Sequence, residues 1–520
     1  MEYSSMFAFT LTQTYMLRIC AESEEKMLGR PIKKYEFWFV VGSQFLYGQE
    51  TLNEVANHAR SMVASLNTRG VLPCSLVYQA TVKTSDEIER LIKDANYDEA
   101  CAGIITWMHT FSPSKMWING LSLLQKPYCH LHTQYNRSIP DQDIDMDFMN
   151  LNQSAHGDRE HAFIAARMRL PRKIIAGFWE DESVTHDLAS WMRASVGAIE
   201  SRKLKVVRFG DNMRNVAVTE GDKVGVQMQL GWQVNTWGVG DLIRELEEVS
   251  DSEVQAQMDV YQERYVFNTE DVETVRYQAK EEIAMRKFLE RERASAYTNT
   301  FEDLQQMRQL PGLASQNLMA QGFGYGGEGD WKVSAMTALI KKMTEGMTGG
   351  TTFMEDYTYH MEKGNELSLG AHMLEICPSI STEKARVEVH ELGIGGKEPP
   401  ARLVFEGHPG KAVLASLVDM GGRLRLIINE IVVVKPIFTM PKLPVARVMW
   451  KPEPDLYTAS HLWMLAGGAH HAVLSYDASA KMLQDWSEIM GIECVVINKD
   501  STVDTMKQQL FLSDIAWKLR

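Results

Sequence analysis

The sequence has few cysteines, and none of them are arranged in a structural or redox motif. Six cysteines are spread over 520 residues without any C-x-x-C pair. This pattern excludes the usual zinc ribbons and dithiol redox motifs, and it favours a reducing compartment in which disulfides do not persist. We therefore expect a cytoplasmic protein.

Long apolar runs and an excess of positive charge are also absent. No run of 18 apolar residues occurs, so we expect no membrane-spanning helix. Lysine and arginine number 54 against 68 aspartates and glutamates, which gives a formal net charge of −14. Because nucleic acids and anionic membranes bind concentrated positive charge, neither is an expected partner.

Two common catalytic signatures are missing as well. No H-E-x-x-H and no G-x-S-x-G occurs, which argues against a zincin protease and an α/β-hydrolase. The composition is otherwise that of a globular protein, with 45% hydrophobic and 23% charged residues. A chain of 520 residues is long enough for about three domains.

The N-terminal residues differ from the rest of the chain. Residues 1–27 have no periodic apolar face, and the apolar stretch from Met6 to Leu11 has no basic region before it, unlike a signal peptide. We expect residues 1–27 to be a disordered extension, with Met27 as an alternative start.

From Tyr35 onward, strand-like and helix-like segments alternate. Thr84 and Glu87 form the pattern of a capping box before a helix at 86–94, and a further helix is predicted at 114–125. This alternation predicts parallel, doubly wound sheets, in which ligands bind at the carboxyl ends of the strands. The predicted strands are 36–41, 74–82, 101–107, 128–133, 173–178 and 205–209. Polar residues at their ends are 42–44, 109–110, 132–134 and 210–212.

The pattern changes in the second half of the chain. Residues 236–295 are predicted to be helical with solvated, charged faces. After Ser368, alternating runs at 423–429 and 430–435 predict short strands. We expect an α/β protein of three domains, of which the first two are doubly wound and the last is β-rich. Their predicted bounds are 28–204, 205–348 and 349–520.

A glycine-rich segment, Gly322–Gly327, matches G-x-G-x-x-G. A dinucleotide site needs a buried strand before the first glycine, but residues 313–321 are helical in composition. The nucleotide-binding interpretation is therefore disfavoured. We interpret the segment as a flexible loop that places Glu328.

Two glutamates and a few histidines are candidates for a metal site. Glu328 and Glu355 lie among glycines and aromatic residues, where paired carboxylates can bind a metal or divide acid and base roles. His372 lies in an apolar stretch, where a lone histidine is more often a core residue. His470 and His471 are adjacent, so at most one of them is expected to be a ligand. Oxygen and imidazole donors without cysteine favour Mn²⁺ or Mg²⁺ in an octahedral site.

Several sequence blocks are distinctive in combination, among them Gly327-Glu-Gly-Asp-Trp-Lys and Phe353-Met-Glu-Asp-Tyr-Thr-Tyr-His. The others are 39–48, 97–98, 109–120, 145–157, 208–214, 370–379 and 466–471. Together they resemble the L-arabinose isomerase family over nearly the whole chain from Tyr35. The resemblance implies conversion of L-arabinose to L-ribulose with one Mn²⁺ per subunit. It also implies a homo-hexamer assembled from trimers, with active sites near subunit interfaces.

The resemblance also implies roles for individual residues. The metal ligands correspond to Glu328, Glu355, His372 and His471. Sugar contacts correspond to Gln44, Leu46 and Met213, and His156 corresponds to a residue that reaches a neighbouring subunit's site. Whether D-galactose is also converted, to D-tagatose, stays open at this point.

Two other classes of protein are alternatives. A non-catalytic sugar-binding protein suits a doubly wound domain, but it does not need the four metal-ligand candidates together. An NAD-dependent sugar dehydrogenase depends on the glycine-rich segment alone.

Overall fold

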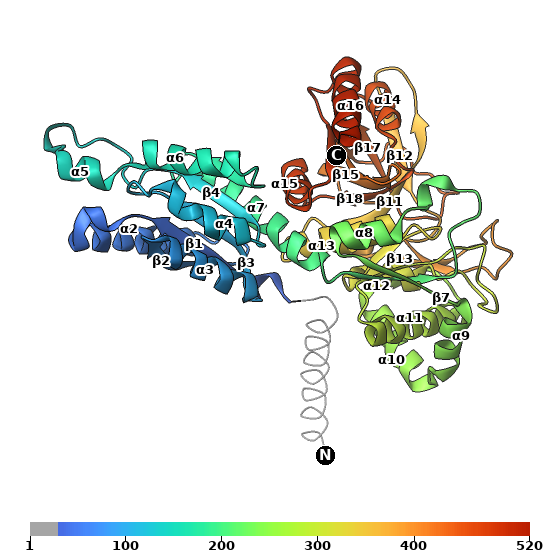
Figure 1. Cartoon of the computed structure of the whole chain (residues 1–520). Helices are drawn as coiled ribbons and strands as arrows, with labels where there is room; N and C mark the ends of the chain where they lie inside the picture. Colours follow the sequence, from blue (N-terminus) through green and yellow to red (C-terminus); the bar gives the residue numbers. More distant parts are fainter. Residues whose placement is uncertain (1–29, 520) are drawn as a thin grey trace, which may run out of the picture. The chain divides into compact units, whose positions relative to one another are not determined.

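The computed structural model describes residues 30–519 (Figure 1). The predicted extension, residues 1–27, lies outside the described residues. The chain forms two units, one of residues 30–199 with 481–490, and one of residues 200–480 with 491–519. The first unit therefore takes nearly all of helix α15 (Ala480–Met490) from late in the chain. The predicted domain bounds at 204 and 348 stay predictions.

The N-terminal unit contains a five-stranded parallel sheet in the order β2-β1-β3-β4-β5. Its strands are β1 (Glu36–Gly42), β2 (Ser75–Val82), β3 (Cys101–Trp107), β4 (Tyr128–His132) and β5 (Lys173–Ala176). Its helices are α2 (Gly48–Thr68), α3 (Ser85–Tyr97), α4 (Ile118–Leu123), α5 (Met146–Leu151), α6 (Ser154–Arg167) and α7 (Glu182–Ser201). This is the predicted doubly wound arrangement.

Strand β1 shows why the sheet is covered on both faces. Phe37 and Phe39 belong to a core that includes residues of α2 and α7, whereas Trp38 and Val40 belong to a second core with residues of α3 and α4. Because successive side chains point to opposite faces, a continuous apolar run produces a strand that is buried twice.

Two local predictions in this unit are modified. Thr84 accepts a hydrogen bond from the Glu87 amide as predicted, but the Glu87 carboxylate accepts from Lys83 N and not from Thr84 N. The predicted helix 114–125 is a short turn, Ser114–Trp117, followed by α4. It ends early, at Leu123, because Leu124 is extended and Asn96 Nδ2 donates to the Leu123 carbonyl at 2.8 Å.

The central part of the chain forms a four-stranded parallel sheet in the order β10-β9-β6-β7. Its strands are β6 (Lys205–Phe209), β7 (Gln233–Trp237), β9 (Ala296–Thr298) and β10 (Gly324–Gly326). The helices are α8 (Lys223–Leu230), α9 (Val239–Glu248), α10 (Asp251–Arg264), α11 (Val272–Glu292), α12 (Leu313–Ala320) and α13 (Trp331–Met343). Helices α9 to α11 confirm the helical prediction for 236–295. The charged faces are not solvated throughout as predicted, because Glu281 and Glu282 are buried.

The glycine-rich segment is not the flexible loop that we predicted. Gly324 and Gly326 lie in strand β10, and helix α12 precedes them. A Cβ atom at Gly324 would lie 2.2 Å from the carbonyl oxygen of Ser334, and one at Gly326 would lie 2.4 Å from that of Asp330. These glycines allow the strand to pack closely against the start of α13, where any side chain would collide.

The C-terminal part forms an antiparallel barrel. The strands β15-β18-β11-β12-β17-β16 are neighbours in that order, and β15 also pairs with β16, which closes the ring. They are β11 (Thr351–His360), β12 (Leu367–Ala371), β15 (Gly410–Asp419), β16 (Leu424–Val434), β17 (Arg447–Pro452) and β18 (His471–Ser475). The two predicted runs at 423–435 are one strand, β16.

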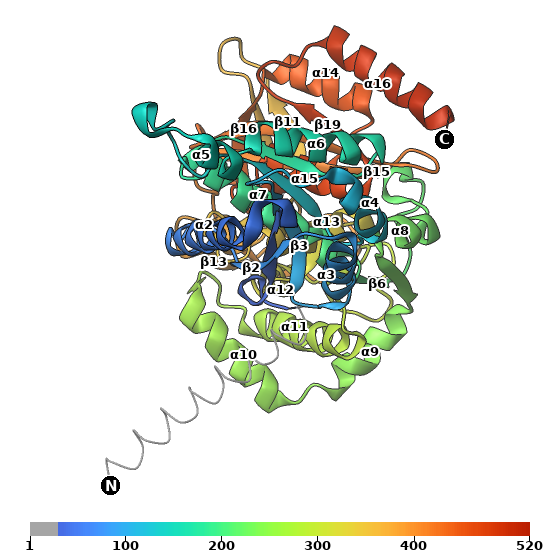
Figure 2. The same ribbon diagram turned by 60° about the vertical axis from the view of Figure 1, so that its left-hand side comes forward.

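Further elements surround the barrel. Strand β19 (Glu493–Ile497) adds to β16 in parallel, and a small sheet contains β8 (Val266–Phe267), β13 (Arg386–Val389) and β14 (Ala401–Val404). Helices α14 (Leu456–Ala466) and α16 (Val503–Lys518) lie side by side, and α14 packs against barrel strands β16 and β17 (Figure 2). Within residues 30–519, no helix has both the length and the hydropathy needed to cross a membrane.

Candidate metal centre

The four predicted metal ligands come from the central sheet and from three adjacent barrel strands. Glu328 follows β10, Glu355 lies in β11, His372 follows β12 directly, and His471 is the first residue of β18. Glu355 pairs with His471 on one side and with Ala371 on the other. Because opposite residues of antiparallel strands project to the same face, this register brings Glu355 and His471 together.

Donor atoms of three of the four residues form one cluster, and Glu355 lies outside it, beside His372. One donor atom each of Glu328, His372 and His471 lies within 4.8 Å of the other two. Glu355 Oε2 lies 3.9 Å from His372 Nε2, and Glu328 Oε2 lies 3.8 Å from His471 Nε2. Donors around one ion at about 2.1 Å are about 3.0–4.2 Å apart, so a small inward movement suffices to bind it.

Both histidines are held by a buried carboxylate. His372 Nδ1 lies 2.5 Å from Glu375, and His471 Nδ1 lies 3.3 Å from Asp330. An N–H donated from Nδ1 leaves the Nε2 lone pair free for a metal, which is the arrangement of histidine ligands in metal sites. His471 Nε2 is buried and has no hydrogen-bond partner among the described residues. The ring of Phe353 packs edge-on against both imidazoles, at 4.9 and 5.1 Å.

Glu328 is placed by a short loop with left-handed backbone. Its φ is +61°, and that of Gly329 is +80°. Met213 N donates to the Glu328 carbonyl at 2.9 Å, and Asn212 Nδ2 donates to that of Gly329 at 3.2 Å. Asn299 accepts from the Gly329 amide at 2.9 Å. The segments that follow β6 and β9 thus hold the loop that follows β10.

Gly329 offers a test of this placement that removes no candidate ligand. A Cβ atom there would lie 2.5 Å from Asn212 Cα, which is backbone and cannot rotate away. We expect Gly329→Ala to lower kcat about 10²-fold, because a shift of about 1 Å in a reacting group has that effect. Gly364→Ala is the matched control, since Gly364 also has a positive φ but has open space around it. Equal kcat values for the two variants would contradict this role of Gly329.

The two glutamates have opposite tendencies to hold a proton. The hydrogen bond with His470, at 3.5 Å, lowers the pKa of Glu328 below its ordinary value. Burial raises the pKa of Glu355 above its ordinary value, although His372 opposes that shift. Burial opposes protonation of His372, but the Glu375 carboxylate outweighs it and the pKa of His372 is raised.

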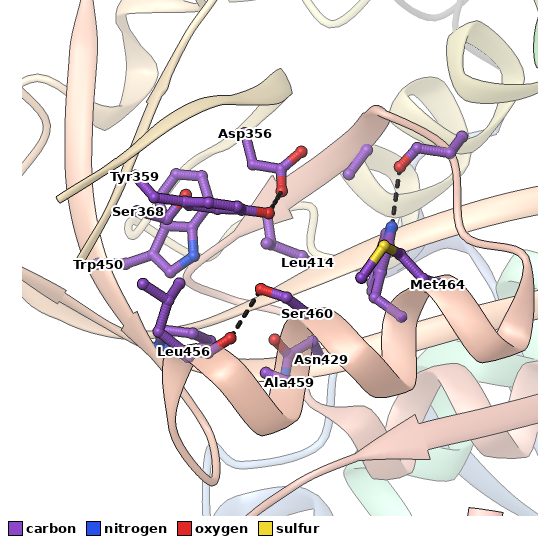
Figure 3. A pocket seen from close by; sticks show the side chains of 14 residues that line it. Asp356, Tyr359, Ser368, Leu414, Asn429, Trp450, Leu456, Ala459, Ser460 and Met464 are labelled. Atoms are coloured by element: carbon purple, nitrogen blue, oxygen red, sulfur yellow. Dashed lines mark hydrogen bonds between the residues drawn. The ribbon is translucent and has the colours of Figure 1, made fainter. Parts of the chain in front are cut away.

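The neighbour of Glu355 in sequence belongs to a different environment. Asp356 points into the barrel, where it lines a cavity of about 60 Å³ together with Ser368 and Trp450. Tyr359 donates a hydrogen bond to its carboxylate at 3.0 Å (Figure 3). The pleat of β11 therefore directs Glu355 toward His372 and Asp356 to the barrel interior.

The comparisons with known proteins agree with this architecture. Models of the L-arabinose isomerase N-terminal, central and C-terminal domains match residues 31–203, 205–346 and 350–493. An L-arabinose isomerase of Anoxybacillus flavithermus is 56% identical over 94% of this chain and 98% of its own length. The chain belongs to the L-arabinose isomerase family. Family members from Geobacillus stearothermophilus and Thermotoga petrophila are 55% and 54% identical, each over 94% of this chain and 99% of its own length.

The sugar-contact residues implied by the L-arabinose isomerase resemblance lie in both units. Met213 lies beside Glu328, since its amide donates to the Glu328 carbonyl. Gln44, Leu46 and His156 belong to the N-terminal unit. Leu46 is 81% exposed, and the exposed His156 ring stacks against Phe111 at 5.3 Å.

Gln44 and His156 both lie near the carboxyl ends of the N-terminal strands. Tyr47, close to Gln44 in sequence, donates a hydrogen bond to Gln153 at 3.2 Å. Gln153 and His156 line a pocket of about 560 Å³. This edge is where a doubly wound sheet binds ligands.

Some residues of the centre were not predicted from the sequence. Asp330 and Glu375 orient the histidines, and Phe353 packs edge-on against both rings. His470, which the sequence offered only as an alternative to His471, contacts Glu328. The spacing of Glu375, three residues after His372, was a usable signal, because a ligand histidine commonly has a carboxylate partner.

Proposed function

We propose that this protein is an isomerase that converts L-arabinose to L-ribulose at the metal centre of Glu328, Glu355, His372 and His471. The observation that carries the proposal is the pair of Nε2 atoms, each oriented by a buried carboxylate, beside two glutamates of unequal pKa. Membership of the L-arabinose isomerase family supports the substrate. The scattered cysteines favour the cytoplasm as its location.

The donor set is suited to Mn²⁺. Carboxylate oxygens and imidazole nitrogens suit a hard or borderline divalent ion, and the unpartnered Nε2 of His471 is a buried lone pair that a cation would occupy. When bound, such an ion polarises the carbonyl of the open-chain sugar and orients its first two oxygens.

The two glutamates divide the proton transfers of the proposed reaction. Isomerisation moves hydrogen from C2 to C1, which needs a base near C2 and O2 and an acid near O1. The lowered pKa of Glu328 favours its carboxylate form, which suits the base, and the raised pKa of Glu355 favours proton uptake, which suits the acid. Opposite shifts of two neighbouring groups support such a division.

In this proposal Gln44, Leu46 and Met213 contact the sugar. His156 contributes from a neighbouring subunit of a homo-hexamer. D-Galactose, which shares the open-chain aldose chemistry, is a second substrate that is converted to D-tagatose.

A direct assay tests the proposal against its alternatives. The purified protein is mixed with L-arabinose and Mn²⁺ without nicotinamide, and ketose is measured, with D-galactose in a parallel reaction. We expect L-ribulose to form. Sugar binding without ketose would indicate a binding protein, and turnover only with NAD would indicate a dehydrogenase. Turnover of L-arabinose alone would remove D-galactose from the proposal.

Mixing inactive variants tests whether sites are shared between subunits. We expect His156→Ala and Glu355→Gln each to be inactive alone, and a mixture to regain part of the activity. The reason is that a hybrid site can combine an intact His156 with an intact Glu355. The control shows that subunits exchange in the mixture. The two variants carry different labels, and the mass of the mixed oligomers is measured. Exchange without any recovery of activity would show that the sites are not shared.

A further inference from the structure

Helices α14 and α16 are neighbours (Figure 2), and both carry exposed apolar side chains. On and just after α16, Phe511 is 65%, Leu512 57% and Leu519 82% exposed, and Ile515 is 39% exposed. We call these four residues the α16 stripe. On α14, Tyr457 and Met464, one heptad apart, are 54% and 71% exposed.

The α16 stripe is a second apolar face of a helix that already packs on the barrel. Val503, Met506 and Leu510 form the inner face and contact the core beneath it. The stripe follows the spacing i, i+1, i+4, i+8, which places its members on one outer side of the helix. No other described residue buries this side. Grouped exposed apolar residues on adjacent helices are typical of a protein interaction surface.

The charges on α16 indicate which partner this surface takes. Asp504 precedes Phe511 by seven residues, and Lys518 follows it by seven, so both lie on the side of the stripe. Both are exposed. If a second α16 crosses antiparallel at Phe511, Asp504 of each copy lies opposite Lys518 of the other. The helix is therefore complementary to itself, which is what a two-fold contact requires.

We propose that the outer face of α14 and α16 is a two-fold contact between two copies of this chain. The α16 helices run antiparallel across the axis with Phe511 at its centre, and Tyr457 and Met464 pack beside them. The 16-residue helix is about 24 Å long and the pair about 20 Å wide, which gives about 480 Å² per copy. Since a stable interface needs about 800 Å² per partner, this contact acts together with others in a larger assembly.

The inference deepens the proposed hexamer, on which it rests in part. Two trimers can form a closed hexamer only through two-fold contacts, and this surface supplies one per subunit. The position of the contact does not depend on the number of subunits, because a plain dimer would use the same surface.

Replacement of the central aromatic residue tests the contact. In Phe511→Glu, two negative charges face each other at the two-fold axis. We expect the dissociation constant of the contact to rise about 10³-fold. Sedimentation velocity on the full chain should show the particle mass fall by half. Tyr457→Glu on the neighbouring helix should act in the same direction. Met228→Glu is the matched control, since Met228 is 83% exposed on α8, and it should keep the wild-type mass.

A reversal of charges distinguishes a second copy from another occupant. We expect Asp504→Lys and Lys518→Asp each to weaken the contact, and the double variant to restore it. A chain that starts at Met27 should keep its mass, which excludes residues 1–26 as the occupant. Wild-type mass in both glutamate variants, or no recovery in the double variant, overturns the proposal. A wild-type dimer that Phe511→Glu splits into monomers upholds the contact and removes the hexamer.

Discussion

Removal of divalent metal by a chelator should lower the rate of ketose formation from L-arabinose by about three orders of magnitude. The expected loss follows from the several kcal/mol of charge stabilisation that a metal supplies to a polarised carbonyl, at about 1.4 kcal/mol per tenfold in rate. The measurement is turnover after chelation and gel filtration, with the metal content determined on the same sample.

Refilling the protein separates a metal role from damage by the chelator. Added Mn²⁺ should restore the rate and raise the melting temperature, because an ion that binds only the folded state stabilises it. A Glu328→Gln, Glu355→Gln double variant is the control, and its melting temperature should respond much less to Mn²⁺. Full turnover by protein from which no metal can be detected would refute the metal centre.

The N-terminal fold was predictable because its signals are local. Phe37, Trp38 and Phe39 in succession can only be buried by layers on both faces of a sheet, and that is what surrounds β1. The barrel was predicted only as β-rich. Its closure depends on β15 pairing with both β16 and β18, and no local pattern encodes a pairing between strands so far apart in sequence.

The glycine-rich segment shows a different limit of sequence reasoning. A glycine is compatible with a flexible loop and equally with a close approach of backbones, and the sequence alone does not distinguish them. The packing of Gly324 and Gly326 against α13 shows that these glycines serve a close approach of two backbone segments. The consequence for the site is that Glu328 leaves a rigid strand and enters a loop with fixed, left-handed backbone.

The donor residues of the candidate site were predictable, but the carboxylates that orient its histidines were not. Glu355 was a candidate from its sequence surroundings, and His471 was chosen over His470 from the resemblance. The register of β11 and β18 places the two side by side. Asp330 and Glu375 were missed because a carboxylate that orients a histidine has no signature of its own in sequence. Their role depends on which ring nitrogen they face, and that follows only from side-chain geometry.

Glu328→Gln and Glu355→Gln should each lower kcat by about three orders of magnitude or more. Glutamine keeps the shape and one carbonyl oxygen, but it removes the negative charge and the ability to exchange a proton. Loss of a positioned acid or base costs about 10²–10⁴-fold, and loss of an anionic metal ligand adds to it. The double variant should be hardly slower than either single variant, since groups that act as a unit are not additive. Steady-state rates at saturating L-arabinose measure these effects.

The dependence on Mn²⁺ concentration decides whether the two glutamates are more than ligands. His372→Ala removes a neutral ligand whose Nδ1 is held by Glu375, so its main defect is weaker metal binding, and excess Mn²⁺ should recover part of its activity. The two glutamine variants should stay inactive at the same Mn²⁺ concentration, because added metal does not replace a proton carrier. If saturating Mn²⁺ restores them as fully as it restores His372→Ala, Glu328 and Glu355 are ligands alone. Their unequal pKa values would then reflect only the hydrogen bond from His470 and the burial of Glu355, without a part in proton transfer.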